Sequence, residues 1–197
     1  MQTSLRTSAL VAGLSLALMA ALAPLGLILA LPSGAIGVAA VVVLAIAALD
    51  VVAGVALYPV LTSGGTLLAG SAAALRIAYA AVFAAAAGFL FGPADAVRFQ
   101  AIWDAGLLIF ALHLILVGVA AIRSPSIPIW IGALVLIAGA GYAVDSVTTA
   151  LLPASPTAIA QFTFVGEVVL LVWLIGWGGR QRGATDRGSF ASASTGG

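Results

Sequence analysis

The sequence predicts an all-α integral membrane protein, a bundle of six transmembrane helices joined by short loops. Of its 197 residues, 63% are hydrophobic and only 7% are charged. Soluble domains are about 45–50% apolar and about 25% charged. A water-soluble fold of this length could not cover its surface with so few charges, so the excess apolar residues must face lipid.

Six apolar segments are long enough to cross a bilayer as helices, which takes about 20 residues. The predicted spans are 9–31, 36–60, 66–91, 100–121, 128–152 and 159–178. Turn-forming stretches separate them: "LPSG" (31–34), "TSGGT" (62–66), "GPADAVR" (92–98), "RSPSIP" (123–128) and "PASPT" (153–157). The runs are continuous rather than alternating, which excludes the pattern of a transmembrane β-barrel. Short links predict that successive helices run antiparallel.

The ends of the chain complete this division into one transmembrane domain, 9–178. Residues 1–8 form a short N-terminal segment, and 179–197 are rich in Gly and Ser and predicted to be a disordered tail. The first span has an alternative interpretation as a cleaved signal peptide, because Arg6 precedes it and "ALA" (21–23) resembles a cleavage site. Its apolar run exceeds the usual length of about 7–15 residues, which favours an uncleaved anchor.

The distribution of arginines predicts the orientation in the cell membrane. With a cytoplasmic N-terminus, five arginines lie inside and only Arg98 lies outside; the five are Arg6, Arg123, Arg180, Arg182 and Arg187. The positive-inside rule therefore favours cytoplasmic N- and C-termini. The lipid bilayer is the expected environment, and a membrane-protein partner or a homo-oligomer is possible. The net charge of +1 gives no reason to expect nucleic-acid binding.

Six ionisable residues fall within the predicted spans: Asp50, Arg76, Asp104, His113, Asp145 and Glu167. Each is costly to insert, by about 2.5–3.5 kcal/mol for a central Asp or Arg, so such residues face the bundle interior and tend to pair. Asp50, Arg76 and His113 lie at similar depth on the predicted helices. We expect Asp50 to pair with Arg76, with Glu167 as the second candidate, and His113 to be a core histidine bonded to a neighbouring helix.

Two groups of candidate site residues follow from these positions. Tyr79 lies three residues after Arg76, so it shares a helix face with it and joins Asp50, Arg76 and His113 as a structural ion pair or gate. Tyr142 lies three residues before Asp145. The candidates for a ligand or proton pathway are Asp145, Glu167, Asp104 and Tyr142. Gly132, Gly139 and Gly141 are expected to allow close helix approach.

Enzyme chemistry is not the favoured hypothesis. The chain has no HExxH, no GxSxG and no phosphate-binding glycine loop. It has one histidine and no cysteine, so we expect no metal, no cofactor and no catalytic residue. An intramembrane hydrolase around Asp145 and Ser146 is a third hypothesis, without a well-placed base.

Four stretches carry a resemblance to a known family: "LYPVL" (57–61), "LRIAYAAVFA" (75–84), "GLLIFALHLILVGVAAIRSPSIPIWIGALVLIAGAGYAVDS" (106–146) and "VGEVVLLVWLIGWG" (165–178). The matching positions are Arg76, Arg123, Ser124, Pro128, Gly132, Gly166 and Glu167. In order and spacing the chain resembles a bacterial membrane protein family of unknown function, domain of unknown function 4386. The resemblance implies a multi-helix membrane protein and no particular activity.

Two functional hypotheses remain open from the sequence. The first is a small-solute or proton-coupled transporter in which Asp145 and Glu167 line an outward-facing polar pocket, with Arg76 and Asp50 as the gate. The alternative is a non-catalytic membrane scaffold or sensor subunit whose buried polar residues fix helix packing.

Overall fold

The computed structural model describes residues 2–152 and 157–180, and within these ranges the chain forms helices and connecting turns with no strand. Its elements are α1 (Gln2–Ala23), η1 (Pro24–Ala30), α2 (Ile36–Leu61), η2 (Thr62–Gly64), α3 (Thr66–Ala87), η3 (Gly88–Leu90), α4 (Ala96–Arg123), α5 (Ile129–Leu151), α6 (Ala160–Thr163) and α7 (Val165–Gly176). The predicted disordered tail lies outside the described residues from 181 onward.

Five helices of the described chain are long and apolar enough to cross a membrane. They are Leu5–Ala30, Ile36–Gly64, Thr66–Leu90, Ala96–Arg123 and Ile129–Leu151, with Ala160–Gly176 as a shorter apolar sixth segment. The prediction of an all-α membrane fold is therefore confirmed. Each run has the roughly 20 apolar residues that a helix needs to cross a bilayer. A helix satisfies its backbone hydrogen bonds internally, which an isolated strand in hydrocarbon cannot do, so these runs fold as helices.

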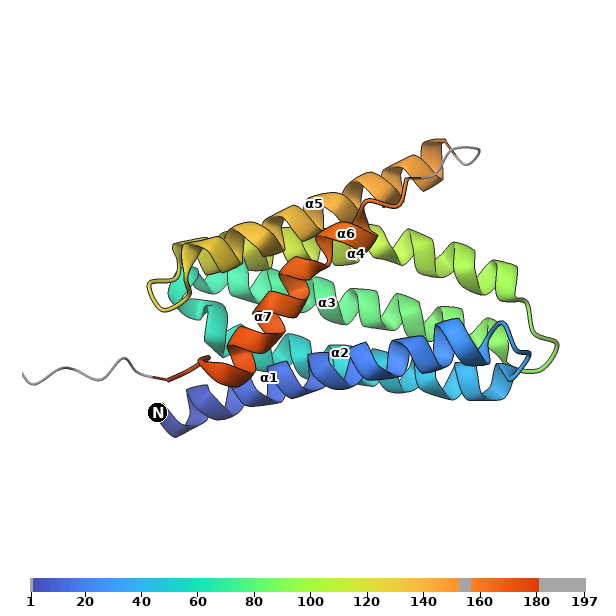
Figure 1. Ribbon diagram of the computed structural model, residues 1–197, viewed down its shortest axis with the longest axis horizontal. Helices are drawn as coiled ribbons and strands as arrows, with labels where there is room; N and C mark the ends of the chain where they lie inside the picture. Colours follow the sequence, from blue (N-terminus) through green and yellow to red (C-terminus); the bar gives the residue numbers. More distant parts are fainter. Residues whose placement is uncertain (1, 153–156, 181–197) are drawn as a thin grey trace, which may run out of the picture.

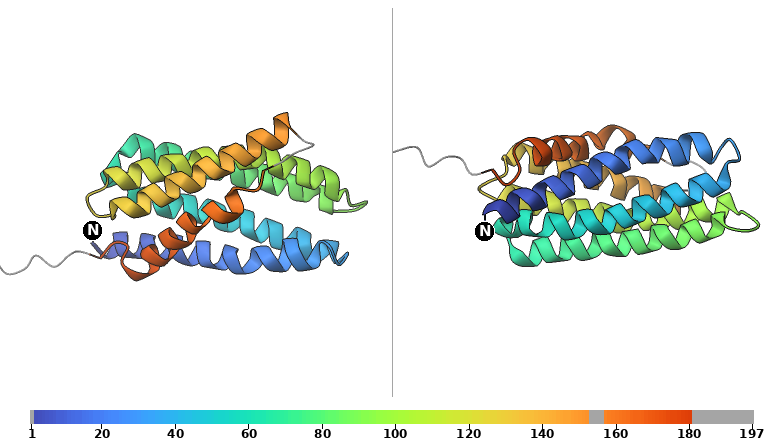
Figure 2. Two further views of the ribbon diagram at one scale, coloured as in Figure 1. Left: turned by 45° about the horizontal axis from the view of Figure 1, so that its top comes forward. Right: turned by 90° about the horizontal axis from the view of Figure 1, so that it is seen from below.

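The helices form a closed ring of neighbours. Each of α1 to α5 packs on the next helix in the chain, and α7 packs against both α5 and α1. Figure 1 shows the up-and-down course, with the N-terminus and the end of α7 at the same end of the bundle. Figure 2 shows α7 running obliquely across the bundle between α5 and α1.

The sixth predicted span, 159–178, is divided in the structure. Phe164 separates α6 from α7, and α7 crosses the bundle diagonally from α5 towards α1 (Figure 1). The break coincides with close contacts on α5. A Cβ atom on Gly166 would clash with the Leu134 carbonyl group, and one on Gly141 would clash with Thr163. These contacts hold the start of α7 against α5, while its far end packs on α1.

Arg6 on α1 fastens the far end of α7. Its guanidinium donates to the carbonyl oxygens of Leu174 (3.0 Å), Ile175 (2.6 Å) and Gly178 (2.8 Å). The last carbonyls of a helix lack intrahelical partners, and a cation there also complements the helix dipole. Arg6, whose position in the sequence helps to predict the membrane orientation, therefore also joins α1 to α7 and closes the ring.

Candidate functional site

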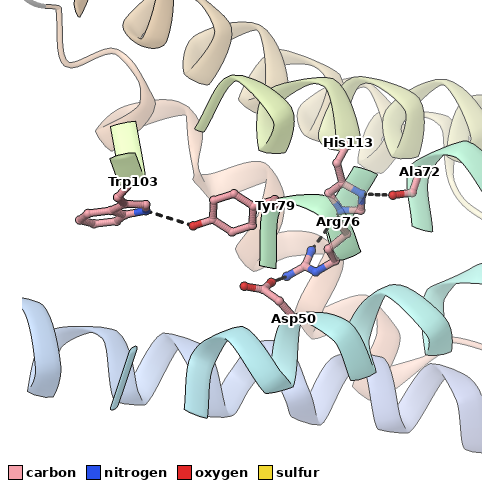
Figure 3. Close-up of polar contacts among 6 residues, drawn as sticks. All are labelled: Asp50, Ala72, Arg76, Tyr79, Trp103 and His113. Carbon is pink, nitrogen blue, oxygen red and sulfur yellow. Dashed lines mark hydrogen bonds and ion pairs between the residues drawn. The ribbon is translucent and has the colours of Figure 1, made fainter. Parts of the chain in front are cut away.

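Three ionisable side chains from three helices meet in the bundle interior (Figure 3). Asp50 comes from α2, Arg76 from α3 and His113 from α4. Their exposed fractions are 3%, 3% and 1%. We call these three residues the polar core.

The shortest contact of the polar core is an ion pair between the Arg76 Nη2 and Asp50 Oδ1 atoms, 2.6 Å apart. Asp50 is the partner that the sequence predicts for Arg76. The helices α2 and α3 are in contact one turn after Asp50, because a Cβ on Gly54 would lie at van der Waals distance, 3.5 Å, from the Arg76 Cβ. The arginine stem therefore lies along α2 and carries its guanidinium to the carboxylate.

His113 joins α4 to α3 at two points one turn apart. Its Nδ1 lies 2.8 Å from the Ala72 carbonyl oxygen, and its Nε2 lies 3.1 Å from Arg76 Nη1. A carbonyl oxygen only accepts and a guanidinium only donates, so Nδ1 must carry the hydrogen and Nε2 must be the acceptor. This arrangement fixes one neutral tautomer of the imidazole and uses both of its nitrogens.

Aromatic rings enclose the polar core on the side of α4. The Arg76 guanidinium carbon lies 5.5 Å from the centre of the Phe110 ring, within cation–π range. The Tyr79 ring packs 4.9 Å from Phe110, and its hydroxyl accepts a hydrogen bond of 3.1 Å from Trp103 Nε1 (Figure 3). Tyr79, predicted to face Arg76, thus bonds to Trp103 instead of to the ion pair.

Glu167 and Tyr142 lie beside the polar core, on α7 and α5. Both side chains are half-buried, and the Tyr142 hydroxyl and the Glu167 carboxyl interact electrostatically. The charges of Arg76 and Asp50 act on Glu167. The Nε atom of Arg76 is buried and makes no hydrogen bond. The site therefore contains a guanidinium nitrogen without an acceptor and one carboxyl group beyond those that the polar core uses.

Asp145 lies apart from the polar core and bonds to the described residues just before and at the start of α6. Its carboxylate accepts hydrogen bonds from Thr157 Oγ1 (2.6 Å), from the Ile159 backbone N–H (2.9 Å) and from the Ala160 backbone N–H (2.7 Å). The first N–H groups of a helix have no intrahelical acceptor, so a carboxylate there acts as a cap. Three acceptor contacts give Asp145 a local structural role.

Substituting Asp145 by alanine is expected to lower the free energy of unfolding by about 1 kcal/mol, within the range of lost helix caps. The measurement is unfolding in mixed detergent micelles, together with hydrogen exchange of residues 157–163, which should speed up selectively. Asp104→Ala is the matched control, because Asp104 accepts a single bond, from the Gln100 side chain at 2.8 Å. Equal exchange in the two variants would contradict the capping role.

The four pathway candidates are therefore not gathered in one place. Glu167 and Tyr142 face the interior, Asp145 bonds to the segment before α6, and Asp104 bonds to Gln100 on its own helix. The sequence did not point to the Ala72 carbonyl group or to Phe110 as parts of the site. Their spacing was the available signal, because Ala72 lies four residues before Arg76 and Phe110 lies three residues before His113. In the part of the chain that the structure describes, no group of three or more His, Cys, Asp or Glu side chains is placed to hold a metal ion.

The ring of apolar helices around an ionic interior defines a polytopic α-helical membrane protein. Comparison with known proteins gives the family. A domain of unknown function (DUF4386) matches residues 95–178, which span α4 to α7. An uncharacterized protein of Archaeoglobus fulgidus is 35% identical over 127 residues, which are 64% of this chain and 75% of that protein. The chain belongs to this family of unknown function. No solved structure matches it significantly.

Proposed function

We propose that the protein is a non-catalytic membrane scaffold or sensor subunit whose buried charges fix the packing of its helices. The observation that carries this proposal is the closure of the polar core: Asp50 and His113 both bond to Arg76, and the exposed fractions of Asp50, Arg76 and His113 are 3%, 3% and 1%. Ionisable residues that serve transport face a pathway for ions or substrate. The cavities beside α7 and beside the α4–α5 connection are lined by other residues of the described chain.

A buried polar group supports specificity more directly than stability. Apolar helices can slide or rotate against one another with little change in buried area, whereas an unpaired Arg or Asp in hydrocarbon is costly. The ion pair between α2 and α3 and the two histidine bonds between α3 and α4 allow one register of these helices. A rigid platform of this kind suits a subunit that presents its outer faces to another membrane protein.

The arginine distribution supports a cell-membrane location with cytoplasmic termini. Arg6, Arg123 and Arg180 belong to the end of the bundle that carries both termini of the described chain, and Arg98 belongs to the opposite end, where it pairs with Asp95 at 3.8 Å. This asymmetry follows the positive-inside rule.

The experiment compares partner capture with flux. Crosslinking in native membranes followed by purification should return a membrane protein in a fixed ratio to this chain. In proteoliposomes, the wild type and Glu167→Gln should show the same absence of flux across a panel of solutes and proton gradients. Flux that Glu167→Gln abolishes would overturn the scaffold proposal, as would purification of a lone monomer from crosslinked membranes.

One observation favours proton-coupled transport as the second candidate. Glu167 and Tyr142 are half-buried next to Arg76, whose Nε hydrogen has no acceptor. A carboxyl group in that position is suited to exchange a proton or to contact a solute, with Asp50 and Arg76 as the gate. Here Tyr142→Phe serves as the conservative variant: a proton flux that falls in both Glu167→Gln and Tyr142→Phe supports this candidate.

A further inference from the structure

An apolar groove opens between α5 and α7 at the end of the bundle where both termini of the described chain lie. Because α7 leaves α5 on its diagonal course to α1, the two helices separate towards this end (Figures 1 and 2). The space between them is a cavity of about 660 Å³. Its walls include Trp130 from the start of α5 and Val168, Val172 and Trp173 from α7.

Tryptophans line this groove without being buried by the protein. The exposed fractions of Trp130 and Trp177 are 58% and 61%. Tryptophan is enriched where the hydrocarbon of a bilayer meets the headgroups, because the indole is apolar with one polar N–H. Three of the four tryptophans of the chain line this one space, and the fourth, Trp103, belongs to the aromatic group around Tyr79.

A positive charge lies at the mouth of the groove. Arg180 is exposed and lines both this cavity and a neighbouring one of about 500 Å³, which extends towards Leu5 and Val60. Ser126, Trp173 and Trp177 are also shared by the two cavities. Among the described arginines, Arg180 is the one that lines both cavities, and Arg6 nearby already donates to three carbonyl oxygens. We therefore assign the anion contact to Arg180.

We infer that this groove binds an anionic phospholipid, with an acyl chain between α5 and α7 and the phosphate at Arg180. The apolar walls face the bilayer, so hydrocarbon is the chemistry that fills them. The cavity volume is in the range of about 300–1,000 Å³ that small-molecule sites occupy. Basic pockets between transmembrane helices on the cytoplasmic side recognise anionic headgroups. This binding is independent of whether the protein is a scaffold or a transporter.

The test is quenching of tryptophan fluorescence by brominated lipids in reconstituted bilayers. A variant that carries Trp103→Phe reports only on the groove. A second variant, with Trp130, Trp173 and Trp177 all replaced by phenylalanine, reports only on Trp103 and is the control. Brominated phosphatidylglycerol is compared with brominated phosphatidylcholine at equal bromine content.

The groove tryptophans should be quenched at about fivefold lower mole fraction of phosphatidylglycerol than of phosphatidylcholine, the preference expected for one arginine at an anionic surface. Trp103 should show no preference. Arg180→Gln should abolish the headgroup preference, whereas the matched variant Arg98→Gln, at the opposite end of the bundle, should leave it unchanged. Val168→Phe keeps Arg180 and narrows the groove without adding a tryptophan, so it should weaken quenching by both lipids.

Two results would overturn the inference. Equal quenching by both lipids, unaffected by Arg180→Gln, means that the groove holds only bulk bilayer lipid. Weak quenching by either lipid, together with a dimer that Val168→Phe dissociates, means that a second copy of the chain fills the groove.

Discussion

Replacing Arg76 with methionine is expected to destabilise the bundle by about 3–5 kcal/mol, the cost of leaving one partner of a buried ion pair uncompensated. The substitution removes the cation 2.6 Å from Asp50 and the donor 3.1 Å from His113 Nε2. Both groups are almost fully buried, so water cannot replace the lost contacts. Reversible unfolding in mixed detergent micelles measures the change.

The matched control for this prediction is the double variant Asp50→Leu with Arg76→Met. Replacing both members of a buried pair by apolar residues of similar volume is often neutral or stabilising, so the double variant should recover most of the loss. Recovery is incomplete because His113 Nε2 still lacks its donor. Asp50→Leu alone should be destabilising too, since the guanidinium cannot lose its charge. Additive effects of the two single substitutions would contradict a coupled pair.

These variants also separate structural from functional charge. If the polar core only fixes helix register, the rescued double variant should still capture the same membrane partner as the wild type. If Asp50 and Arg76 gate a transport pathway, the double variant folds but loses flux. The unfolding measurement then reports on the structural role of Asp50 and Arg76, and the capture or flux measurement reports on their functional role.

The number and class of the helices were predictable because the bilayer sets the length of an apolar span. The grouping of Asp50, Arg76 and His113 was also accessible, since depth along antiparallel helices follows from sequence position. The rotation of each helix about its own axis could not be predicted from the sequence. These helices are apolar on nearly every face, so no hydrophobic stripe tells which side faces the interior.

Asp145 illustrates this limit. From sequence it is an intramembrane carboxylate on the face of Tyr142, and in the structure it bonds to backbone N–H groups fourteen and fifteen residues later. That role depends on the path of the α5–α6 connection, which no apolar run encodes. The turn at Phe164 lies beside the close contacts that Gly141 and Gly166 make with neighbouring segments, and sequence position alone does not reveal these contacts.

The second large effect on the free energy of unfolding is expected from replacing the glycines where α4 and α5 pack together. A Cβ on Gly139 would lie 2.8 Å from the Ile115 nitrogen and 2.9 Å from the Ala111 carbonyl oxygen. A Cβ on Gly132 would lie 2.9 Å from the Gly118 carbonyl oxygen. Most of these neighbours are backbone atoms of α4, so no side-chain rotation can make room, and the two helices must move apart.

Gly139→Leu is therefore expected to lower the free energy of unfolding by at least about 3 kcal/mol, and Gly139→Ala by about 1–3 kcal/mol, the usual cost of overpacking. Unfolding in mixed micelles gives both values. The control is Gly37→Ala on α2, where an added Cβ would meet nothing within 4 Å, and where alanine should be neutral or slightly stabilising.

Because Ala111 and Ile115 flank His113 on α4, separating α4 from α5 should also disturb the histidine bonds to Ala72 and Arg76. Gly139→Leu combined with His113→Ala should then destabilise less than the sum of the two, and strict additivity would show that the glycine contact and the polar core are independent.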